Sequence, residues 1–426
     1  MTRMAENGPR PRALILALNG LDHDRRVMNE ARSLSEAGFE VTRVGVRTRP
    51  SHPGEESSGF DRIRRISPHW YRMQTPTDAA TVNPTRAQLP LVRQWEWKLR
   101  LMAWLRRTFA GTLAGVDALR DWLRWNQAAA DACIDQAPDL VLATDFDALL
   151  AGWRIKRRTG CALIYDAHEL WVDMPSRARI SDAFRRLFIL LERRLVRDAD
   201  LTTTVGAGVA REMASRLDIV PPVVVFNGPE RVLAPVQESV GPLRLIFQGV
   251  MEPGRGLEET LEAVISLEGR VSLTLQGFGS MEADLRARVA DSGVSAGVVT
   301  FVDPCQPEHV SACALGHDVG IVSVRPTCLN NILSMPNKYF TYLGSSLAVL
   351  TTREAPEIAS SVEQWGSGLA VDSWTPDAVR RALSWMADHR DAVLVMQQRA
   401  HEAAISYAWG LQFAPVLEWI EDRVTA

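Results

Sequence analysis

Short apolar runs that end in glycine or polar residues recur along this chain. The first two, at 13–19 and 40–46, flank residues 24–38, whose apolar positions have helical spacing. Continuous apolar runs of this length are typical of strands that are buried on both faces of a parallel sheet. The pattern therefore predicts a strand, a helix and a strand, which is the crossover unit of a parallel sheet.

The same pattern returns in both halves of the chain. We expect further strands at 139–145, 162–168, 200–206 and 223–228, and then at 243–250, 271–277, 299–303, 318–324 and 347–352. Residues 229–242 contain three prolines and few periodic apolar positions, as a linker does. With 426 residues the chain is long enough for two domains. We predict an α/β fold of two Rossmann-like, doubly wound domains in tandem, with a ligand cleft between their strand ends.

A long helical segment at about 85–136 interrupts this rhythm. It is rich in tryptophan and in basic residues: Trp95, Trp97, Trp104, Trp122 and Trp125, with Arg93, Lys98, Arg100, Arg106 and Arg107. A cationic helix that carries tryptophan can lie on a membrane surface. Aromatic residues at helical spacing are more often part of a core, so we favour packing on the first domain or on a second subunit. The arginine-rich segment 177–200 leaves the same alternatives open.

The composition is that of an ordinary globular protein, with 46% hydrophobic and 23% charged residues. The formal net charge of -3 gives no general attraction to nucleic acid. Five scattered cysteines without a CxxC pair favour free thiols in a cytoplasmic setting over a disulfide or metal site. The apolar runs are too short for a membrane span, and the first one lacks the cleavage site of a secretory signal.

Two glycine pairs, in VGAGVAR (205–211) and LQGFGSME (275–282), are similar to a dinucleotide-binding fingerprint. That fingerprint requires a third small residue, and the residue at this position is Arg211 in one segment and Glu282 in the other. Binding of a nicotinamide or flavin cofactor is therefore disfavoured. We predict that each pair forms a tight turn from a strand to a helix.

Aspartates follow two of the predicted strands in the first half. Asp22 and Asp24 follow the first strand, and Asp145 and Asp147 follow the strand at 139–145. Carboxylates suit hard divalent ions, but aspartate at such a position commonly caps the next helix. Helix capping and contacts to an acceptor are the favoured interpretations, and a metal site is the minority one.

The segment IYDAHELW ends another predicted strand with three polar residues, Asp166, His168 and Glu169. A histidine at this place can exchange hydrogen bonds with a substrate hydroxyl near neutral pH. A lone histidine is usually structural. Three titratable residues within four positions at a strand end favour a substrate site.

Two basic residues stand at turns of the second half. Lys338 follows Pro336 at the predicted start of a helix, where the free N–H groups and the helix dipole attract an anion and disfavour an amine. Arg255 lies between two glycines, after a strand and before a helix. Either residue alone would be interpreted as a solvated surface residue. Together they predict a site for a diphosphate, including one that departs as a leaving group.

At these residues the chain resembles the retaining glycosyltransferases of family 4, which have the two-domain GT-B fold. DRRVMNEARSLSEAGFEVTRVGV resembles their first crossover unit, and IYDAHELW resembles their acceptor-side histidine motif. LIFQGVMEPGRGLEETLEA, LTLQGFGSMEADL, VTFVDP and NNILSMPNKYFTYLGSSLAVL resemble segments of their nucleotide-binding domain. The resemblance implies an acceptor domain at 1–228 with the helical insertion, a donor domain at 229–405, and a last helix at 406–426 that returns to the first domain.

The resemblance also implies roles for individual residues. Lys338 and Arg255 would hold the donor diphosphate, His168 would contact the transferred sugar, and Asp166 is a further catalytic candidate. The donor site would comprise Gly249, Arg255, Gly277, Val302, Asp303, Pro304, Asn330, Asn331, Asn337, Lys338 and Thr341. The acceptor side would comprise Asp22, Asp24, Asp145, His168 and Glu169. No metal is implied, and no cofactor besides a UDP-, GDP- or other nucleotide-diphosphate sugar.

Three departures from the family pattern concern the donor pocket. The family has a Glu-x7-Glu pair whose second glutamate binds the ribose, but the matching residues here are Leu333 and Thr341. The arginine often found after the first donor-domain glycine is Val250, and the small-residue turn is Gly-Ser-Ser at 344–346. A threonine can bond a ribose hydroxyl without charge assistance, at a loss of about 1–2 kcal/mol.

The leading hypothesis is a transferase that moves a sugar from a nucleotide-diphosphate donor to a small-molecule or lipid-linked acceptor. Retention is typical of the family, whereas an inverting enzyme would need a base, for which Asp166 or His168 is a candidate. The alternatives are a catalytically weakened homologue that acts as a partner or scaffold, and a GT-B-like sugar-nucleotide epimerase or phosphorylase. We expect a cytoplasmic protein, and leave open a peripheral contact with the inner membrane face and a homodimer.

Overall fold

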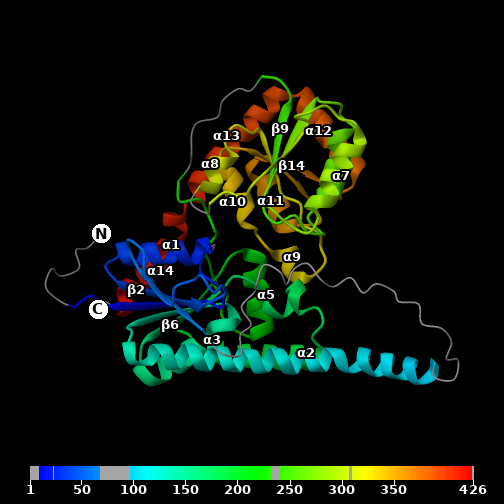
Figure 1. The fold of residues 1–426 in the computed structure, drawn as a ribbon. Helices are drawn as coiled ribbons and strands as arrows, with labels where there is room; N and C mark the ends of the chain where they lie inside the picture. Colours follow the sequence, from blue (N-terminus) through cyan, green and yellow to red (C-terminus); the bar gives the residue numbers. More distant parts are fainter. Residues whose placement is uncertain (1–8, 23, 68–95, 232–239, 307–308, 425–426) are drawn as a thin grey trace. The chain divides into compact units, whose positions relative to one another are not determined.

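The computed structural model describes residues 9–22, 24–67, 96–231, 240–306 and 309–424, with the backbone alone for 96–109 (Figure 1). The chain divides into two compact units. The first comprises Met1–Thr203, Met213–Pro222 and Trp419–Ala426, and the second comprises Thr204–Glu212 and Val223–Glu418. Each unit is built on its own β-sheet and is described by itself. The predicted α/β class is confirmed, and the predicted domain boundaries stay predictions.

The first sheet has eight strands in the order β3-β4-β2-β1-β5-β6-β7-β8. The strands are β1 (Arg12–Leu16), β2 (Glu40–Val46), β3 (Glu55–Ser57), β4 (Arg62–Ile66), β5 (Leu140–Thr144), β6 (Ala162–Ala167), β7 (Leu201–Thr204) and β8 (Val223–Val224). Strands β4, β2, β1, β5 and β6 pair in parallel, and β3 is antiparallel to β4. The apolar runs predicted every strand except β3 and β4, because their sequences EES and RIRRI contain no continuous apolar run.

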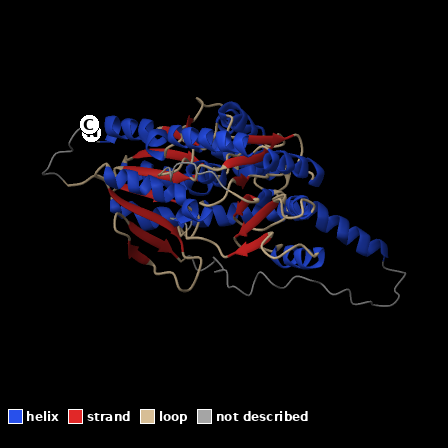
Figure 2. Ribbon diagram, turned by 90° about the horizontal axis from the view of Figure 1, so that it is seen from above, coloured by secondary structure: helices blue, strands red, loops and turns tan. Residues whose placement is uncertain are grey.

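Helices pack on the faces of this sheet (Figures 1 and 2). They are α1 (Arg25–Glu36), α2 (Glu96–Cys133), α3 (Asp145–Thr159) and α4 (Asp182–Val196), with short 3-10 turns at Ile134–Gln136, Trp171–Asp173 and Pro175–Arg177. Helix α5 (Ala207–Leu217) contributes residues to both units. The strands β1 and β5 are almost wholly buried, as expected for the centre of a parallel sheet. Among the described helices, none is both long and apolar enough to span a bilayer.

Two tryptophans of α2 belong to the core. Trp122 and Trp125 are buried, the ring of Trp122 stacks on Phe146 with centroids 4.7 Å apart, and its indole donates to the Phe146 carbonyl at 2.8 Å. Packing on the first domain is therefore confirmed for these two residues. The side chains of the other tryptophans, Trp95, Trp97 and Trp104, lie outside those described, as do those of Arg93, Lys98, Arg100, Arg106 and Arg107.

The second sheet has six parallel strands in the order β11-β10-β9-β12-β13-β14. The strands are β9 (Leu243–Gln248), β10 (Val271–Gln276), β11 (Val299–Val302), β12 (Val319–Ile321), β13 (Ala348–Thr352) and β14 (Gly368–Val371). The sequence pattern predicted all of them except β14, a half-buried edge strand of only four residues. Two sheets built mainly from parallel strands, with helices between the strands, agree with the predicted doubly wound architecture.

Both faces of the second sheet carry helices and a hydrophobic core. The helices are α6 (Leu257–Ile265), α7 (Glu282–Ser292), α8 (Val310–Ala314), α9 (Leu329–Leu333), α10 (Asn337–Gly344), α11 (Pro356–Trp365), α12 (Pro376–Asp388) and α13 (Arg390–Ser406). The last helix, α14 (Trp409–Val424), contributes residues to both units. One core joins the strands to α6, α7 and α12, and another joins them to α10, α11 and α13. This layering leaves the strand ends as the edge where a ligand can reach backbone groups.

The loops after β9 and β10 approach each other so closely that they require glycine. The parallel register aligns Gln276 with Gln248 and with Val302, so Gly249 and Gly277 leave the sheet side by side. Gly277 has a φ of 146°, and a Cβ atom there would lie 2.0 Å from the Gly249 carbonyl oxygen. A side chain at this position would push the two loops apart.

The prediction of free thiols is wrong for two of the five cysteines. Cys305 and Cys313 pair as a disulfide, with Cα atoms 6.7 Å apart, whereas Cys133, Cys161 and Cys328 are free. Cys305 follows β11 and Cys313 lies in α8, so the bridge ties this loop to the helix. The two cysteines are eight residues apart in the sequence, so a search for the CxxC spacing does not identify them as a pair.

We predict that Gly277→Ala destabilises the second unit by about 2–4 kcal/mol, because the new Cβ meets the Gly249 carbonyl and the backbone conformation disfavours a side chain. Gly410→Ala is the matched control, since no atom lies within 4 Å of its added Cβ. Chemical denaturation followed by tryptophan fluorescence measures both variants. Equal stability of Gly277→Ala and the wild type would contradict the described loop packing.

Candidate functional site

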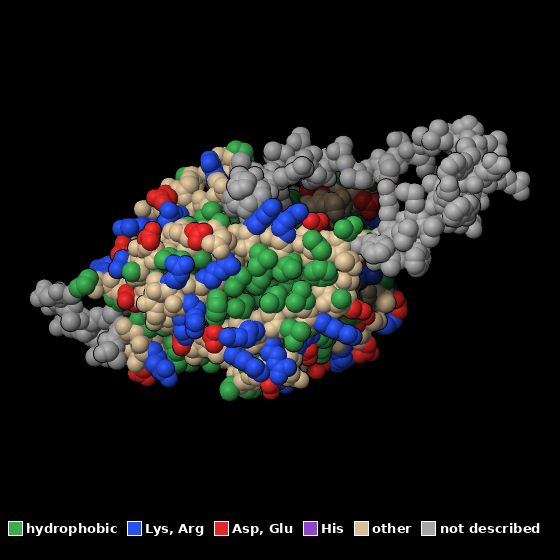
Figure 3. Space-filling view, turned by 90° about the horizontal axis from the view of Figure 1, so that it is seen from below, with side chains coloured by type: hydrophobic (Ala, Val, Ile, Leu, Met, Phe, Trp, Pro, Cys, Tyr) green, Lys and Arg blue, Asp and Glu red, His purple; other side chains and the backbone are tan. Residues whose placement is uncertain are grey.

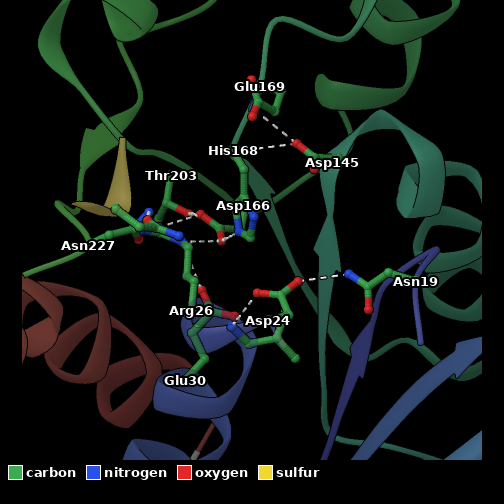
Figure 4. Close-up of polar contacts among 12 residues, drawn as sticks. Asn19, Asp24, Arg26, Glu30, Asp145, Asp166, His168, Glu169, Thr203 and Asn227 are labelled. Atoms are coloured by element: carbon green, nitrogen blue, oxygen red, sulfur yellow. Dashed lines mark hydrogen bonds and ion pairs between the residues drawn. The ribbon is translucent and has the colours of Figure 1, made fainter. Parts of the chain in front are cut away.

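Asp166, near the carboxyl end of β6, is the centre of a buried polar network in the first unit (Figure 4). Its carboxylate accepts hydrogen bonds from the Arg26 guanidinium at 2.7 and 2.6 Å and from the Thr203 hydroxyl, and it contacts His168 Nε2 at 2.6 Å. Arg26 also pairs with Glu30, one turn later in α1, at 3.3 Å. The oxygens of Asp166 are thus fully engaged within the protein.

The charges of this network determine the protonation of its members. Burial opposes ionisation of Asp166, but Arg26 and His168 outweigh it and hold the pKa of Asp166 well below its usual range. Burial also opposes a charge on His168, but Asp166 and Asp145 outweigh it and raise the pKa of His168 to about 10. Near neutral pH His168 is therefore an imidazolium, which donates hydrogen bonds and cannot accept a proton.

Asp145 supports the turn that presents His168. Its carboxylate accepts the backbone N–H of His168 at 2.8 Å and that of Glu169 at 3.1 Å. Burial, as the largest cause, raises the pKa of Asp145 to about 7. The expected helix-capping role is wrong for Asp145, because it is itself the first residue of α3, with a φ of 57°, and its side chain bonds the loop after β6 instead.

The two aspartates that follow β1 have different roles. Asp24 is the N-cap of α1 and accepts from the backbone N–H three residues later, so helix capping is confirmed there. Asp22 pairs instead with Arg65 at 2.9 Å and with His52 at 3.2 Å, in a separate ion cluster. His23 lies outside the described residues. A contact of either aspartate with an acceptor stays a prediction.

One group of side chains in the described part of the chain has the spacing of metal ligands. Glu30, Asp166 and His168 present ligand atoms within 4.8 Å of one another. The guanidinium of Arg26 bonds Asp166 through two nitrogens and pairs with Glu30. Because Arg26 and His168 already supply positive charge at this point, a divalent cation would have to displace them. The geometry therefore favours an ion-pair network over a metal site.

Lys338 dominates the candidate site of the second unit. It lies in the first turn of α10, which has Pro336 as N-cap and no side-chain cap. The amine of this half-buried residue lies 3.7 Å from the centroid of the Phe247 ring. Burial, and then the charge of Arg255, lower the pKa of Lys338 to about 7. The two cations predicted from the sequence are therefore close enough to repel each other.

No carboxylate of the described residues forms an ion pair with Lys338 or Arg255. The turn that carries Arg255 is fixed by its flanking glycines, Gly254 with a φ of 86° and Gly256 with a φ of 64°. A Cβ on Gly256 would lie 2.4 Å from the indole nitrogen of Trp374. The turn thus holds Arg255 near a second cation, and no carboxylate in the described part of the chain pairs with it.

The other predicted donor residues follow the strands of the second sheet. Gly249, Gly277 and the exposed segment Val302–Pro304 lie at the ends of β9, β10 and β11. Asn330 and Asn331 lie in α9, where Asn331 donates to the Thr327 hydroxyl at 2.9 Å, and Asn337 accepts from Asn227 at 2.8 Å. All these residues belong to the loops and helix starts at one edge of the second sheet.

The structure clarifies two of the departures from the family pattern. Thr341 is buried in α10, and its hydroxyl donates to the Asn337 carbonyl at 3.1 Å. The hydroxyl of Thr341 therefore already has a hydrogen-bond acceptor within α10. A contact of Thr341 with a ribose stays a prediction. Ser346 has a φ of 56°, the left-handed region that glycine favours, which explains why this turn requires small residues.

The sequence analysis missed several residues of both sites. Arg26, Glu30 and Thr203 complete the histidine network, and a signal for Glu30 existed, because it lies three residues after Val27 on the apolar face of α1. Phe278, in the loop after β10, is 61% exposed and directly follows Gly277. An aromatic residue between two glycines at a predicted strand end is the sequence signal that could have identified it.

We predict that Asp166→Asn lowers the pKa of His168 from about 10 towards the ordinary value near 6.5, because the charge that stabilises the imidazolium is removed. Titration of the imidazole by NMR measures this shift, and Asp22→Asn is the control. The charge on His168 contributes stability that is complete below its unfolded pKa and is lost as the pH rises through about 10. A His168 that titrates near neutral pH in the wild type would refute the network.

Comparisons with known proteins agree with this architecture. Residues 23–228 match the family described as a glycosyl transferase 4-like domain. Curated proteins give no significant sequence match. A sucrose-phosphate synthase from Thermosynechococcus elongatus is 14% identical, with a TM-score of 0.67 over 96% of this chain and 99% of its own.

Two further solved structures have the same fold at low identity. The trehalose-6-phosphate protein from E. coli, bound with UDP-2-fluoroglucose, is 12% identical, with a TM-score of 0.63 over 97% of this chain and 99% of its own. HepE from Anabaena, in complex with UDP and glucose, is 11% identical, with a TM-score of 0.62 over 96% of this chain and 100% of its own. The family match and the fold agree with the predicted identity: the chain has the GT-B fold of these solved structures, and its residues 23–228 match a glycosyl transferase 4-like domain.

Proposed function

We propose that this chain transfers a sugar from a nucleotide-diphosphate sugar to a small-molecule or lipid-linked acceptor, with retention of configuration and without a metal. The observation that carries the proposal is the pair Lys338 and Arg255, two neighbouring cations at a helix start without a carboxylate partner among the described residues. A diphosphate would supply the missing negative charge. The backbone N–H groups at the start of α10 would add hydrogen bonds to it.

The environment of Lys338 suits a ligand that arrives with its own charge. Its pKa of about 7 means that burial and Arg255 together oppose protonation in the free protein. A bound diphosphate reverses this balance, because it places negative charge beside the amine. The same two cations would then stabilise the charge that develops on the departing diphosphate during transfer.

Apolar side chains beside the cations suit the nucleoside of such a donor. Phe278 is 61% exposed, and Val250 and Val302 are each 39% exposed, at the ends of three adjacent strands. A nucleobase can stack on an exposed aromatic ring, and this contact tolerates different bases. UDP is the first nucleotide to test, since HepE from Anabaena and the E. coli protein have been solved with UDP or a UDP-sugar.

The histidine network favours retention over inversion. An inverting transfer needs a base, but His168 is protonated near neutral pH and Asp166 is fully engaged by Arg26, His168 and Thr203. Neither sequence candidate is therefore available as a base. In our proposal the sugar–diphosphate bond breaks, the acceptor oxygen bonds the anomeric carbon on the same face, and the acceptor proton passes to the departing diphosphate oxygen. His168 would donate a hydrogen bond to the transferred sugar.

A scaffold without activity is the second candidate, because Leu333 and Thr341 replace the glutamate pair of the family. A scaffold has no need for two cations held together at an energetic cost, so the structure gives it less support. An epimerase or phosphorylase would use the same cations, and product analysis without an acceptor separates these activities. The cytoplasmic setting and a homodimer stay predictions.

We predict that UDP binding at about pH 8 takes up close to one proton per site, because the ligand raises the pKa of Lys338 from about 7. Calorimetry in buffers of different ionisation enthalpy measures this uptake. Lys338→Gln should abolish the uptake and weaken binding about ten- to one-hundred-fold. Lys156→Gln, which removes a lysine paired with Asp200 at 2.6 Å, is the control and should behave as the wild type. Tight binding of UDP by Lys338→Gln would refute the diphosphate site.

A second prediction concerns the nucleoside. Phe278→Ala should weaken UDP binding about ten-fold, because stacking of the base on the ring is lost. The competition of inorganic pyrophosphate with UDP at this site should stay unchanged. Leu315→Ala, which truncates an exposed side chain of the same unit, is the control. Equal UDP affinity of Phe278→Ala and the wild type would remove Phe278 from the site.

A further inference from the structure

An apolar patch lies on the surface of the first unit, over α2 and α4, and basic side chains border it (Figure 3). Its exposed leucines and valine are Leu113 (64%), Val116 (47%) and Leu123 (41%) of α2, and Leu187 (37%) and Leu190 (60%) of α4. Single exposed leucines are ordinary, but large side chains gathered in one patch mark an interaction surface. We call this surface the α2–α4 face.

The two helices of the α2–α4 face are pressed against each other. A Cβ on Gly115 of α2 would lie 2.3 Å from the ring of Phe184 in α4, and the Ser181 N–H donates to the Gly111 carbonyl at 3.1 Å. This close approach needs the two glycines. Because the helices pack directly, their outward leucines form one continuous surface, while Trp122 of α2 faces the core.

The border of the α2–α4 face carries more positive than negative charge. Arg186 and Arg194 of α4 are exposed, as are Arg197 at its C-cap and Arg124 of α2. Arg193 and Arg197 share one partner, the exposed Asp218, and Arg194 pairs with Asp198. Exposed ion pairs of this kind contribute little and exchange readily for another anion. Two acidic residues of α2, Asp117 and Asp121, are neutralised in part by Arg120.

An anionic membrane surface fits this combination better than a second copy of the chain. A two-fold dimer through the α2–α4 face would bring the arginines of both copies together, and like charges would oppose it. Lipid phosphates instead complement the arginines, while the leucines enter the boundary between head groups and acyl chains. The basic sequence continues upstream in the same helix with Lys98, Arg100, Arg106 and Arg107.

We propose that the α2–α4 face binds the surface of an anionic membrane, with Leu113, Val116, Leu123, Leu187 and Leu190 inserted at the interface and the arginines of α4 on lipid phosphates. The inference rests on this surface alone and does not require the proposed transferase activity. If both proposals hold, membrane binding places a lipid-linked acceptor within reach of the enzyme and favours that acceptor class over a soluble one.

The test is co-sedimentation of the full chain with vesicles of phosphatidylcholine, alone or in an equal mixture with phosphatidylglycerol. We predict binding to the mixed vesicles that weakens as salt rises, and little binding to phosphatidylcholine alone. Leu187→Ser/Leu190→Ser should reduce the bound fraction about ten-fold, and Arg186→Glu/Arg197→Glu should reduce it similarly. Leu315→Ser/Leu411→Ser is the matched control, because both leucines are exposed in the second unit, and it should bind as the wild type.

Two outcomes would overturn the inference. One is equal binding by the leucine variant and the wild type. The other is no vesicle binding, together with a dimer in light scattering that Leu187→Ser/Leu190→Ser converts to a monomer, which would assign the face to a second copy. Stabilisation of the same variants by UDP is measured in parallel. If the protein fails to bind vesicles but UDP still stabilises it, the membrane inference fails and the proposed function stands. If the protein binds vesicles but UDP does not stabilise it, the proposed function fails and the membrane inference stands.

Discussion

A lysine amine held beside an arginine, without a carboxylate partner in the described part of the chain, is the constraint on which the proposed donor site depends. Lys338 lies in the first turn of α10, where the helix dipole disfavours a cation, and burial and Arg255 oppose its charge as well. The face of the Phe247 ring is the one described contact that attracts the amine. A bound anion would offset the contributions that oppose the charge. The glycine turn of Arg255 and the close loops at Gly249 and Gly277 form the surrounding backbone.

In the first unit, by contrast, the buried charges around Asp166 are paired with one another. There Asp166 is paired with Arg26, and Asp166 and Asp145 together raise the pKa of His168 to about 10, so that its imidazole is a hydrogen-bond donor after β6 near neutral pH. The donor side and the histidine side therefore both supply positive charge or hydrogen-bond donors, and neither supplies a base from the residues that the sequence suggested. A reaction in which the leaving diphosphate itself accepts the proton needs nothing more from these groups. This consistency links the two sites chemically.

The sequence predicted the strands that are buried on both faces, because such strands leave a continuous apolar run. It did not predict β3, β4 or β14, since edge strands alternate or are too short to leave that signal. Lys338 and Arg255 were predicted as site residues because a cation near a helix start is locally unfavourable, which can be recognised from the sequence alone; their role stays a prediction. Arg26 and Glu30 were missed because opposite charges one turn apart normally face solvent. The disulfide between Cys305 and Cys313 and the left-handed conformation of Asp145 depend on tertiary packing, which the residue order does not reveal.

The most direct measurement is a crystal structure of the protein with bound UDP. The account predicts diphosphate oxygens within hydrogen-bonding distance of the Lys338 amine and the Arg255 guanidinium, with further contacts to the first N–H groups of α10. A nucleotide whose diphosphate contacts neither Lys338 nor Arg255 would contradict it.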